Sequence, residues 1–250
     1  MNKYIKNLNR IEFVVTWACT GRCKHCSEGE HSLRGEHING DVAAKAVHDI
    51  CAAYDIQSIM TFGGEPLLHP EDVCKIHAAA KKAGIPDRAL ITNGFFNKDK
   101  GRIKEMACML AEHGVGSVLL SADAFHQETI PIEPVMFFAE CVKSAGLAIQ
   151  IQPAWLVSEE DENPYNRKTK EILHRFAPMD IRVADGNIIF PSGNAKKYLS
   201  AYFDEDKEYV NPYEENPQDI HTISFNPNGD VLNGNINREH IMDIIDAYEG

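Results

Sequence analysis

The sequence predicts an α/β fold in which helices cover a parallel sheet. Two observations carry this prediction. Six short apolar segments alternate with segments of helical periodicity between residues 11 and 184, and several of these apolar segments are continuous runs rather than polar–apolar alternations. Continuous runs are typical of strands covered on both faces. With 250 residues, 44% of them hydrophobic, the chain can bury one large core and still form a short appendage.

The strands are expected where short runs rich in β-branched and other apolar residues are bounded by turn residues. The six expected strands are 11–16, 57–62, 88–93, 116–122, 147–154 and 179–184.

Helices are expected between these strands. The first follows an Asn39-Gly40-Asp41 start signal and carries an apolar stripe from Val42 to Tyr54. The second opens at Pro70 and ends before Gly84, the usual Pro-first, Gly-last asymmetry. Three further helices are expected over 99–113, 134–145 and 166–176. Periodicity alone allows an open doubly wound sheet or a barrel, and in both the reactive site lies at the carboxyl ends of the strands.

The alternation stops after residue 184. A short helix is expected within 191–198, an acidic surface loop over 204–219, a hairpin over 223–233 with its turn at Asn228-Gly229, and a last amphipathic helix over 240–248. We therefore expect a core domain over 1–184 and a C-terminal extension over 185–250 that packs against it.

Composition restricts the function classes. The chain has 25 Lys and Arg against 37 Asp and Glu, a net charge of −12, which suits a nucleic-acid binder poorly. We find neither a signal peptide nor a membrane-spanning run, and seven cysteines, an odd number, suit metal ligands and free thiols better than disulfides. We therefore expect a cytoplasmic protein without nucleic-acid or membrane partners.

A cysteine triplet directly follows the first expected strand. Cys19, Cys23 and Cys26 are spaced C-x3-C-x2-C, so their thiolates can meet at one metal centre from a loop. Thiolates select zinc or iron–sulfur clusters, and a structural zinc site needs a fourth ligand. Three cysteines on a cubane cluster leave one iron open to bind and activate a ligand. A zinc loop, or three unrelated thiols, is the alternative.

The triplet, with Gly63-Gly64-Glu65-Pro66 at the end of the second expected strand, resembles the radical S-adenosylmethionine (SAM) superfamily. The resemblance implies a partial (β/α)6 TIM-like barrel with a short C-terminal α+β extension. It also implies that Cys19, Cys23 and Cys26 are metal ligands and catalytic residues, holding a [4Fe–4S] cluster whose open iron chelates SAM. Reductive cleavage of SAM then gives a 5′-deoxyadenosyl radical that abstracts hydrogen from a substrate. The family usually has an aromatic residue before the last cysteine, where this chain has His25.

The same resemblance implies cofactor-binding residues at the strand ends. In the family the GGEP segment binds the SAM amino group, and two glycines at a strand end allow close approach of a ligand to the backbone. A TNG at the end of strand three lies beneath SAM in several subfamilies, and a Ser-x-Asp at the end of strand four reaches SAM. The residues that we expect to bind SAM are Gly63, Gly64, Glu65, Pro66, Asn93, Ser121, Asp123 and Gln152.

Some of these residues have simpler interpretations. Asp123 could cap the following helix. Gln150 and Gln152 share one face of the fifth strand, where a buried polar side chain needs a partner. His126 could contact substrate or lie on the surface, and Arg182 could pair with a carboxylate of SAM, of a substrate or of a surface residue.

The C-terminal Gly229–Asn233 segment resembles the start of the Cys-rich domain of peptide- and protein-modifying members of the family. No cysteine follows Cys141, so we expect one cluster and no auxiliary cluster. The remaining cysteines each fall in a separate expected helix and are expected to be structural: Cys51, Cys74, Cys108 and Cys141.

From this resemblance we expect an enzyme that acts on a peptide or protein, with an electron donor such as flavodoxin or ferredoxin. A small-molecule enzyme that rearranges or cyclises its substrate is the alternative within the same class. Activation of a glycyl-radical protein, or a non-catalytic iron–sulfur sensor or carrier, also stays open.

Overall fold

The computed structural model describes residues 2–204, 206–211 and 213–250, so Met1 and two residues of the expected surface loop, Glu205 and Pro212, lie outside the described residues. A seven-stranded sheet in the order β7-β5-β4-β3-β2-β1-β9 forms its centre, and every neighbouring pair is parallel. The strands of this sheet are β1 (Arg10–Val14), β2 (Ser58–Phe62), β3 (Asp87–Thr92), β4 (Ser117–Ser121), β5 (Ala148–Gln152), β7 (Arg182–Val183) and β9 (Thr222–Phe225).

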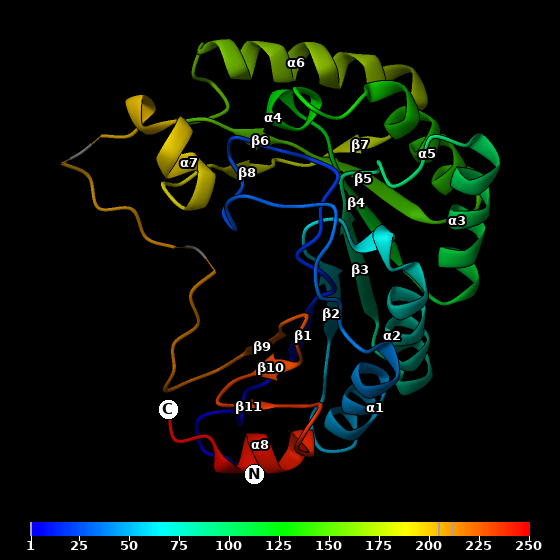
Figure 1. Ribbon diagram of the computed structural model, residues 1–250, viewed down its shortest axis with the longest axis vertical. Helices are drawn as coiled ribbons and strands as arrows, with labels where there is room; N and C mark the ends of the chain where they lie inside the picture. The colour runs from blue at the N-terminus through cyan, green and yellow to red at the C-terminus, as the bar shows by residue number, and fades with distance from the viewer. Residues whose placement is uncertain (1, 205, 212) are drawn as a thin grey trace.

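Helices cover one face of the sheet, and shorter helices lie beyond the carboxyl ends of its strands (Figure 1). The covering helices are α1 (Gly40–Cys51), α2 (Pro70–Ala83), α3 (Lys100–Glu112) and α5 (Ile132–Ser144). The others are α4 (Ala124–Gln127), α6 (Pro164–Phe176), α7 (Gly193–Tyr198) and α8 (Ile241–Ala247), with 3₁₀ turns at Pro66–Leu68, Ala177–Met179 and Ser200–Tyr202.

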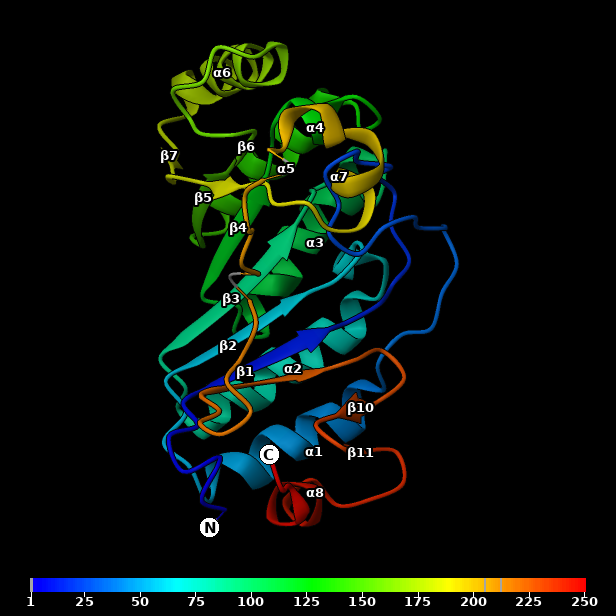
Figure 2. The same ribbon diagram turned by 90° about the vertical axis from the view of Figure 1, so that its left-hand side faces the viewer.

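The sheet curves but stays open, with β7 and β9 as its edges. The prediction of an α/β partial barrel is therefore confirmed. Figure 2 looks onto the face opposite the covering helices, where residues 213–221 cross in front of the strands on their way to β9. The strands run toward the end of the molecule that holds α4 and α7, so their carboxyl ends face these helices.

The helix limits follow the local signals closely. The Asn39 side chain accepts hydrogen bonds from the backbone N–H groups of Asp41 and Val42 and so starts α1. Helix α2 spans the predicted 70–83 and ends at Gly84, whose φ of 83° is left-handed.

The predicted limits of the fifth and sixth strands are wrong, because contacts with distant residues determine where these strands begin and end. The fifth expected strand ends at Gln152; after Pro153 the chain forms β6 (Ala154–Trp155), which pairs with β8 (Asn187–Ile188). The sixth shrinks to two residues, because a 3₁₀ turn and a left-handed Asp180 (φ 50°) precede it.

The expected hairpin over 223–233 is wrong. Residues 222–225 pair in parallel with β1, where Phe225 stacks on Phe13 at 4.6 Å between ring centroids. The tight turn before Gly229 is present, but the antiparallel ladder joins β10 (Asp230–Val231) to β11 (Gly234–Asn235). The C-terminal segment thus supplies a strand to the central sheet, and the division at residue 184 stays a prediction. Among the described helices, none combines the length and apolar character that crossing a bilayer requires.

Candidate active site

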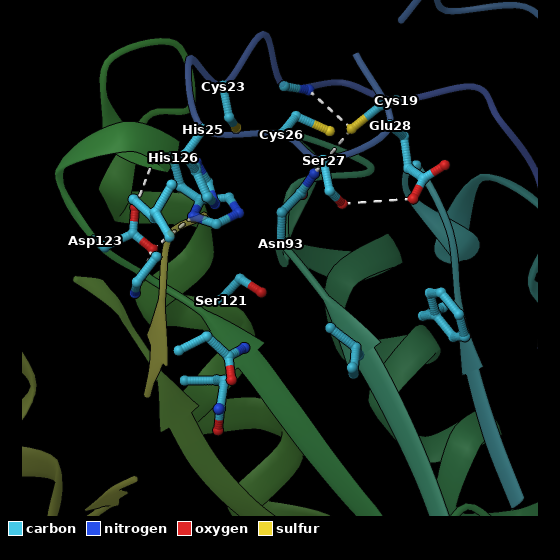
Figure 3. A pocket seen from close by; sticks show the side chains of 18 of the residues that line it. Cys19, Cys23, His25, Cys26, Ser27, Glu28, Asn93, Ser121, Asp123 and His126 are labelled. Carbon is cyan, nitrogen blue, oxygen red and sulfur yellow. Dashed lines mark hydrogen bonds and ion pairs between the residues drawn. The ribbon is translucent and has the colours of Figure 1, made fainter. Parts of the chain in front are cut away.

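The three cysteines lie together on the loop that follows β1 (Figure 3). Cys19 and Cys23 are less than 10% exposed, and Cys26 is partly buried. Gly21 lies between two of the sulfurs: a Cβ atom at this position would be 3.2 Å from the Sγ of Cys23 and 3.7 Å from the Sγ of Cys19. The loop therefore places the sulfurs of Cys19 and Cys23 on either side of Gly21, and the role of the three thiols as metal ligands stays a prediction.

Contacts from distant parts of the chain hold this loop. The backbone N–H of Cys19 donates to Ser32 O at 2.9 Å. From α7, the Asn194 side chain donates to Cys23 O at 3.1 Å and its backbone N–H donates to Cys26 O at 2.9 Å. The backbone of the triplet is thus fixed from both sides without using the thiols.

Burial favours the protonated, uncharged form of the three thiols. Burial, with the nearby Glu65 carboxyl, raises the pKa of Cys19 to about 11. Burial also raises the pKa of Cys23 well above its usual value and, less strongly, that of Cys26. Three thiolates that line one cavity need a positively charged partner, which a metal centre provides as its binding releases protons.

A cavity of about 250 Å³ opens beside the cysteines at the carboxyl ends of the strands. Six of the eight residues that we expected to bind SAM line this cavity: Gly63, Gly64, Asn93, Ser121, Asp123 and Gln152. Glu65 and Pro66 are buried behind it, and Gln150 and the exposed Arg182 are outside its lining.

The two glycines of the GGEP segment are needed first for chain packing. A Cβ on Gly64 would lie 2.2 Å from Ala18 O, and one on Gly63 would lie 2.5 Å from Thr16 O. The backbone N–H of Gly64 donates to Thr16 O, and that of Glu65 donates to Ala18 O, both at 2.8 Å. The segment therefore holds the start of the cysteine loop by backbone hydrogen bonds, and its two glycines also line the cavity.

The Glu65 side chain is fully buried and links the ends of β2 and β3. Its Oε1 accepts from Leu67 N–H and from the Thr92 hydroxyl, and its Oε2 accepts from Asn93 N–H at 2.8 Å. Burial raises the pKa of Glu65 to about 7, against the effect of these three donors. Both oxygens have internal partners, so the side chain supports the cavity rather than reaching into it.

Asp123 both caps a helix and orients a histidine. Its Oδ1 accepts from the backbone N–H groups of Phe125 and His126, as the capping alternative predicted. Its Oδ2 accepts from Ala154 N–H and lies 2.8 Å from Nδ1 of His126. Burial alone would raise the pKa of Asp123, but the interaction with His126 outweighs the effect of burial and lowers this pKa to about 2. The pairing leaves Nε2 as the free ring nitrogen of His126, a residue that lines the cavity.

The sequence placed His25 before the last cysteine but predicted no partners for its ring, and it assigned no role to His31. His25 packs against Phe125 and His126, with ring centroids 5.0 and 4.8 Å apart, and burial lowers the pKa of His25 to about 4. The Nε2 of His31 lies 3.1 Å from the Sγ of Cys26. Their positions near the triplet were the only local signal.

The C-terminal segment forms part of the wall of the cavity. Asn187 to Phe190 and Tyr213 line the cavity, and Ile188 to Phe190 also line a neighbouring cavity of about 320 Å³. The side chains around this second cavity are largely apolar and aromatic, including Val157, Tyr202 and Val210.

Comparisons with known proteins place this site in context. The model of the radical SAM superfamily matches residues 13–146, more than half of the chain. A GTP 3′,8-cyclase of Clostridium perfringens (strain SM101 / Type A) is 24% identical over 235 residues, covering 90% of this chain and 69% of that protein.

Two solved structures share the fold. Native anSMEcpe with bound AdoMet has a TM-score of 0.59 at 15% identity, covering 95% of this chain and 80% of that one. Streptococcus suis SuiB bound to its precursor peptide SuiA has a TM-score of 0.56 at 13% identity, covering 98% of this chain. This chain spans 65% of the length of SuiB, and at these identities both likenesses concern the fold alone.

Proposed function

The chain belongs to the radical SAM superfamily, whose enzymes use a [4Fe–4S] cluster and S-adenosylmethionine, and we propose that Cys19, Cys23 and Cys26 hold the cluster. The observation that carries the proposal is that three thiols, two of them buried and one partly buried, line one cavity at the strand ends. When bound, the cluster and SAM supply a 5′-deoxyadenosyl radical that abstracts hydrogen from the substrate. The protein is thus an enzyme that needs a reductant, and we propose a flavodoxin or a ferredoxin in this role.

The residues of the cavity have separate tasks in this proposal. Backbone groups of Gly63 and Gly64, with the Ser121 and Gln152 side chains, bind polar groups of SAM. Glu65 and Asp123 are buried and hydrogen-bonded to the chain itself, so they fix the shape of the cavity and the orientation of His126. Residues 1–184 form the core that binds both cofactors, and the 185–250 extension closes the substrate side.

We propose a peptide or protein side chain or backbone as the substrate. The second cavity shares the lining residues Ile188, Ile189 and Phe190 with the first, and its apolar and aromatic side chains suit an extended chain with apolar residues. The exposed loop beside it carries several carboxylates, including Asp206, Glu208 and Glu214, which would favour basic residues in such a peptide.

A nucleotide is the second candidate, because the relative from Clostridium perfringens is called a GTP 3′,8-cyclase. A triphosphate is bound most effectively by Arg and Lys side chains. Among the described residues that line the two cavities, Lys207 is the only one of these. The charge of the lining therefore favours the peptide.

The test begins with the enzyme reconstituted anaerobically with iron and sulfide, reduced with dithionite and given SAM. We expect 5′-deoxyadenosine from the wild type and none from Cys23→Ala. Cys51→Ala, which removes a half-buried thiol of α1 outside the cavity, is the matched control and keeps the activity. Equal product from wild type and Cys23→Ala would contradict the ligand assignment.

The substrate is identified by deuterium transfer. Peptides encoded beside the gene, and GTP, are each supplied in deuterated form, and 5′-deoxyadenosine is analysed by mass spectrometry. Deuterium from a peptide supports the proposal, whereas deuterium from GTP alone replaces it with the nucleotide reaction.

A further inference from the structure

Asn93 lies between the end of β3 and the cysteine loop and is 5% exposed. Its Nδ2 is 3.6 Å from the Sγ of Cys19, a hydrogen-bonding distance for sulfur, and 3.1 Å from Oγ1 of Thr20. Figure 3 shows the amide directed at the Cys19 sulfur. The sequence suggested a SAM ligand at this position, whereas the described contacts of its amide nitrogen are with the cysteine loop.

The two ends of an Asn amide differ in what they can offer, so its orientation decides the interaction. Oδ1 of Asn93 accepts the backbone N–H of Phe95 at 2.8 Å. Rotating the amide by 180° would place its NH2 group against this N–H, a donor facing a donor. The Phe95 contact therefore fixes the NH2 group on the side of Cys19.

The backbone of Asn93 is fixed as well. Its N–H donates to Oε2 of the fully buried Glu65 at 2.8 Å, and the neighbouring Thr92 hydroxyl donates to Oε1. A second donor, the backbone N–H of Gly21, lies 3.3 Å from the same Cys19 sulfur. The surroundings of this sulfur are thus arranged to donate hydrogen bonds to it.

A hydrogen bond to a ligating sulfur stabilises the form of a cluster that carries more negative charge. Reduction adds one electron, so such donors raise the reduction potential. We propose that Asn93 is a positioning residue whose side-chain amide donates a hydrogen bond to the Cys19 sulfur and raises the reduction potential of the cluster that this sulfur binds. This inference rests on the proposed assignment of Cys19 as a ligand.

Two variants test the inference in the reconstituted enzyme. Asn93→Asp keeps the oxygen that accepts from Phe95 and replaces the donor by a carboxylate oxygen. Asn93→Ala removes the donor without adding charge. We expect both midpoint potentials, measured by redox titration with EPR detection, to be more negative than that of the wild type. At the potential where half of the wild-type clusters are reduced, both variants then show a smaller reduced fraction.

Asn97→Asp is the matched control. Asn97 is exposed, its Oδ1 accepts from Asp99 N–H as an Asp oxygen would, and the variant adds the same charge away from the cysteines. We expect its potential to equal that of the wild type. A wild-type potential in Asn93→Ala would overturn the inference, and loss of SAM affinity at an unchanged potential would make Asn93 a SAM ligand instead.

A measurement on the wild type covers the case in which Asn93→Ala assembles no cluster. With the Asn side-chain amides labelled with ¹⁵N, pulsed EPR of the reduced cluster should show a coupled ¹⁵N that Asn93→Asp lacks. No such coupling in the wild type also overturns the inference. Failure of the wild type to assemble a cluster or to cleave SAM would instead refute the proposed function itself.

Discussion

The Gly64→Ala variant probes how tightly the second strand end supports the cysteine loop. The added Cβ would lie 2.2 Å from Ala18 O, whereas real Cβ contacts are essentially never closer than 3.0 Å. The Ala18 carbonyl must therefore retreat by about 0.8 Å or more. Ala18 precedes Cys19, and ligand distances in metal sites tolerate only about 0.2 Å.

The energetic cost of this variant has two parts. Overpacking of a closed site costs about 1–3 kcal/mol. The retreat also stretches the 2.8 Å hydrogen bond from Glu65 N–H to Ala18 O, which contributes roughly 1 kcal/mol. We expect the free energy of unfolding of the apo protein to fall by about 2–4 kcal/mol, and the protein to fold at 25 °C.

The assay is the iron and sulfide content after anaerobic reconstitution, together with urea unfolding of the apo protein. We expect Gly64→Ala to bind less than one iron per chain, against about four for a complete cubane. Gly101→Ala is the control, because Gly101 lies in the exposed first turn of α3 and its Cβ would meet only the Asp99 side chain. Full iron loading of Gly64→Ala would refute the reasoning.

Three further predictions concern buried polar groups. Glu65→Ala leaves three donors without acceptors and should lower the free energy of unfolding by about 3–5 kcal/mol in urea, with a smaller loss in Glu65→Gln. Burial lowers the pKa of His77 to about 3, so below pH 6.5 the unfolded chain binds a proton that the folded chain does not. Stability should therefore fall as the pH drops from 6.5, by up to about 1.4 kcal/mol per unit from this residue, and His77→Gln should flatten the slope; an unchanged slope would contradict this. Asp123→Asn should keep the α4 cap but change the tautomer of His126 in ¹⁵N NMR of the apo protein, and identical spectra would argue against the Asp123–His126 pairing.

The sequence was sufficient where a few adjacent residues determine the structure. Pro70 and Gly84 mark the ends of α2 because both act through their own backbone angles. The cysteine triplet was recognised in the same way, since its spacing and the GGEP segment are local patterns.

Partners that are distant in the sequence account for what was missed. Strand β9 joins β1 across more than 200 residues, and nothing in residues 222–225 distinguishes a parallel partner from a hairpin partner. The hydrogen bonds of Glu65 with Thr92 and Asn93 were not predicted, because these partners are 27 and 28 residues further along the chain. Asp123 was ambiguous for the same reason, since capping is a local contact and the contact with Ala154 is not.

The hydrogen bonds from Asn194 to the cysteine loop also bear on the order of events during synthesis. Cys26 leaves the ribosome long before Asn194, and at about 5–20 residues per second the delay is on the order of 10–30 s. During this time the loop lacks its contacts with α7, and the edge of β1 is not yet covered by β9. The loop therefore reaches its final shape only after most of the chain has been translated. Iron delivered to the nascent chain before that point would meet three thiols on a loop that still lacks these contacts.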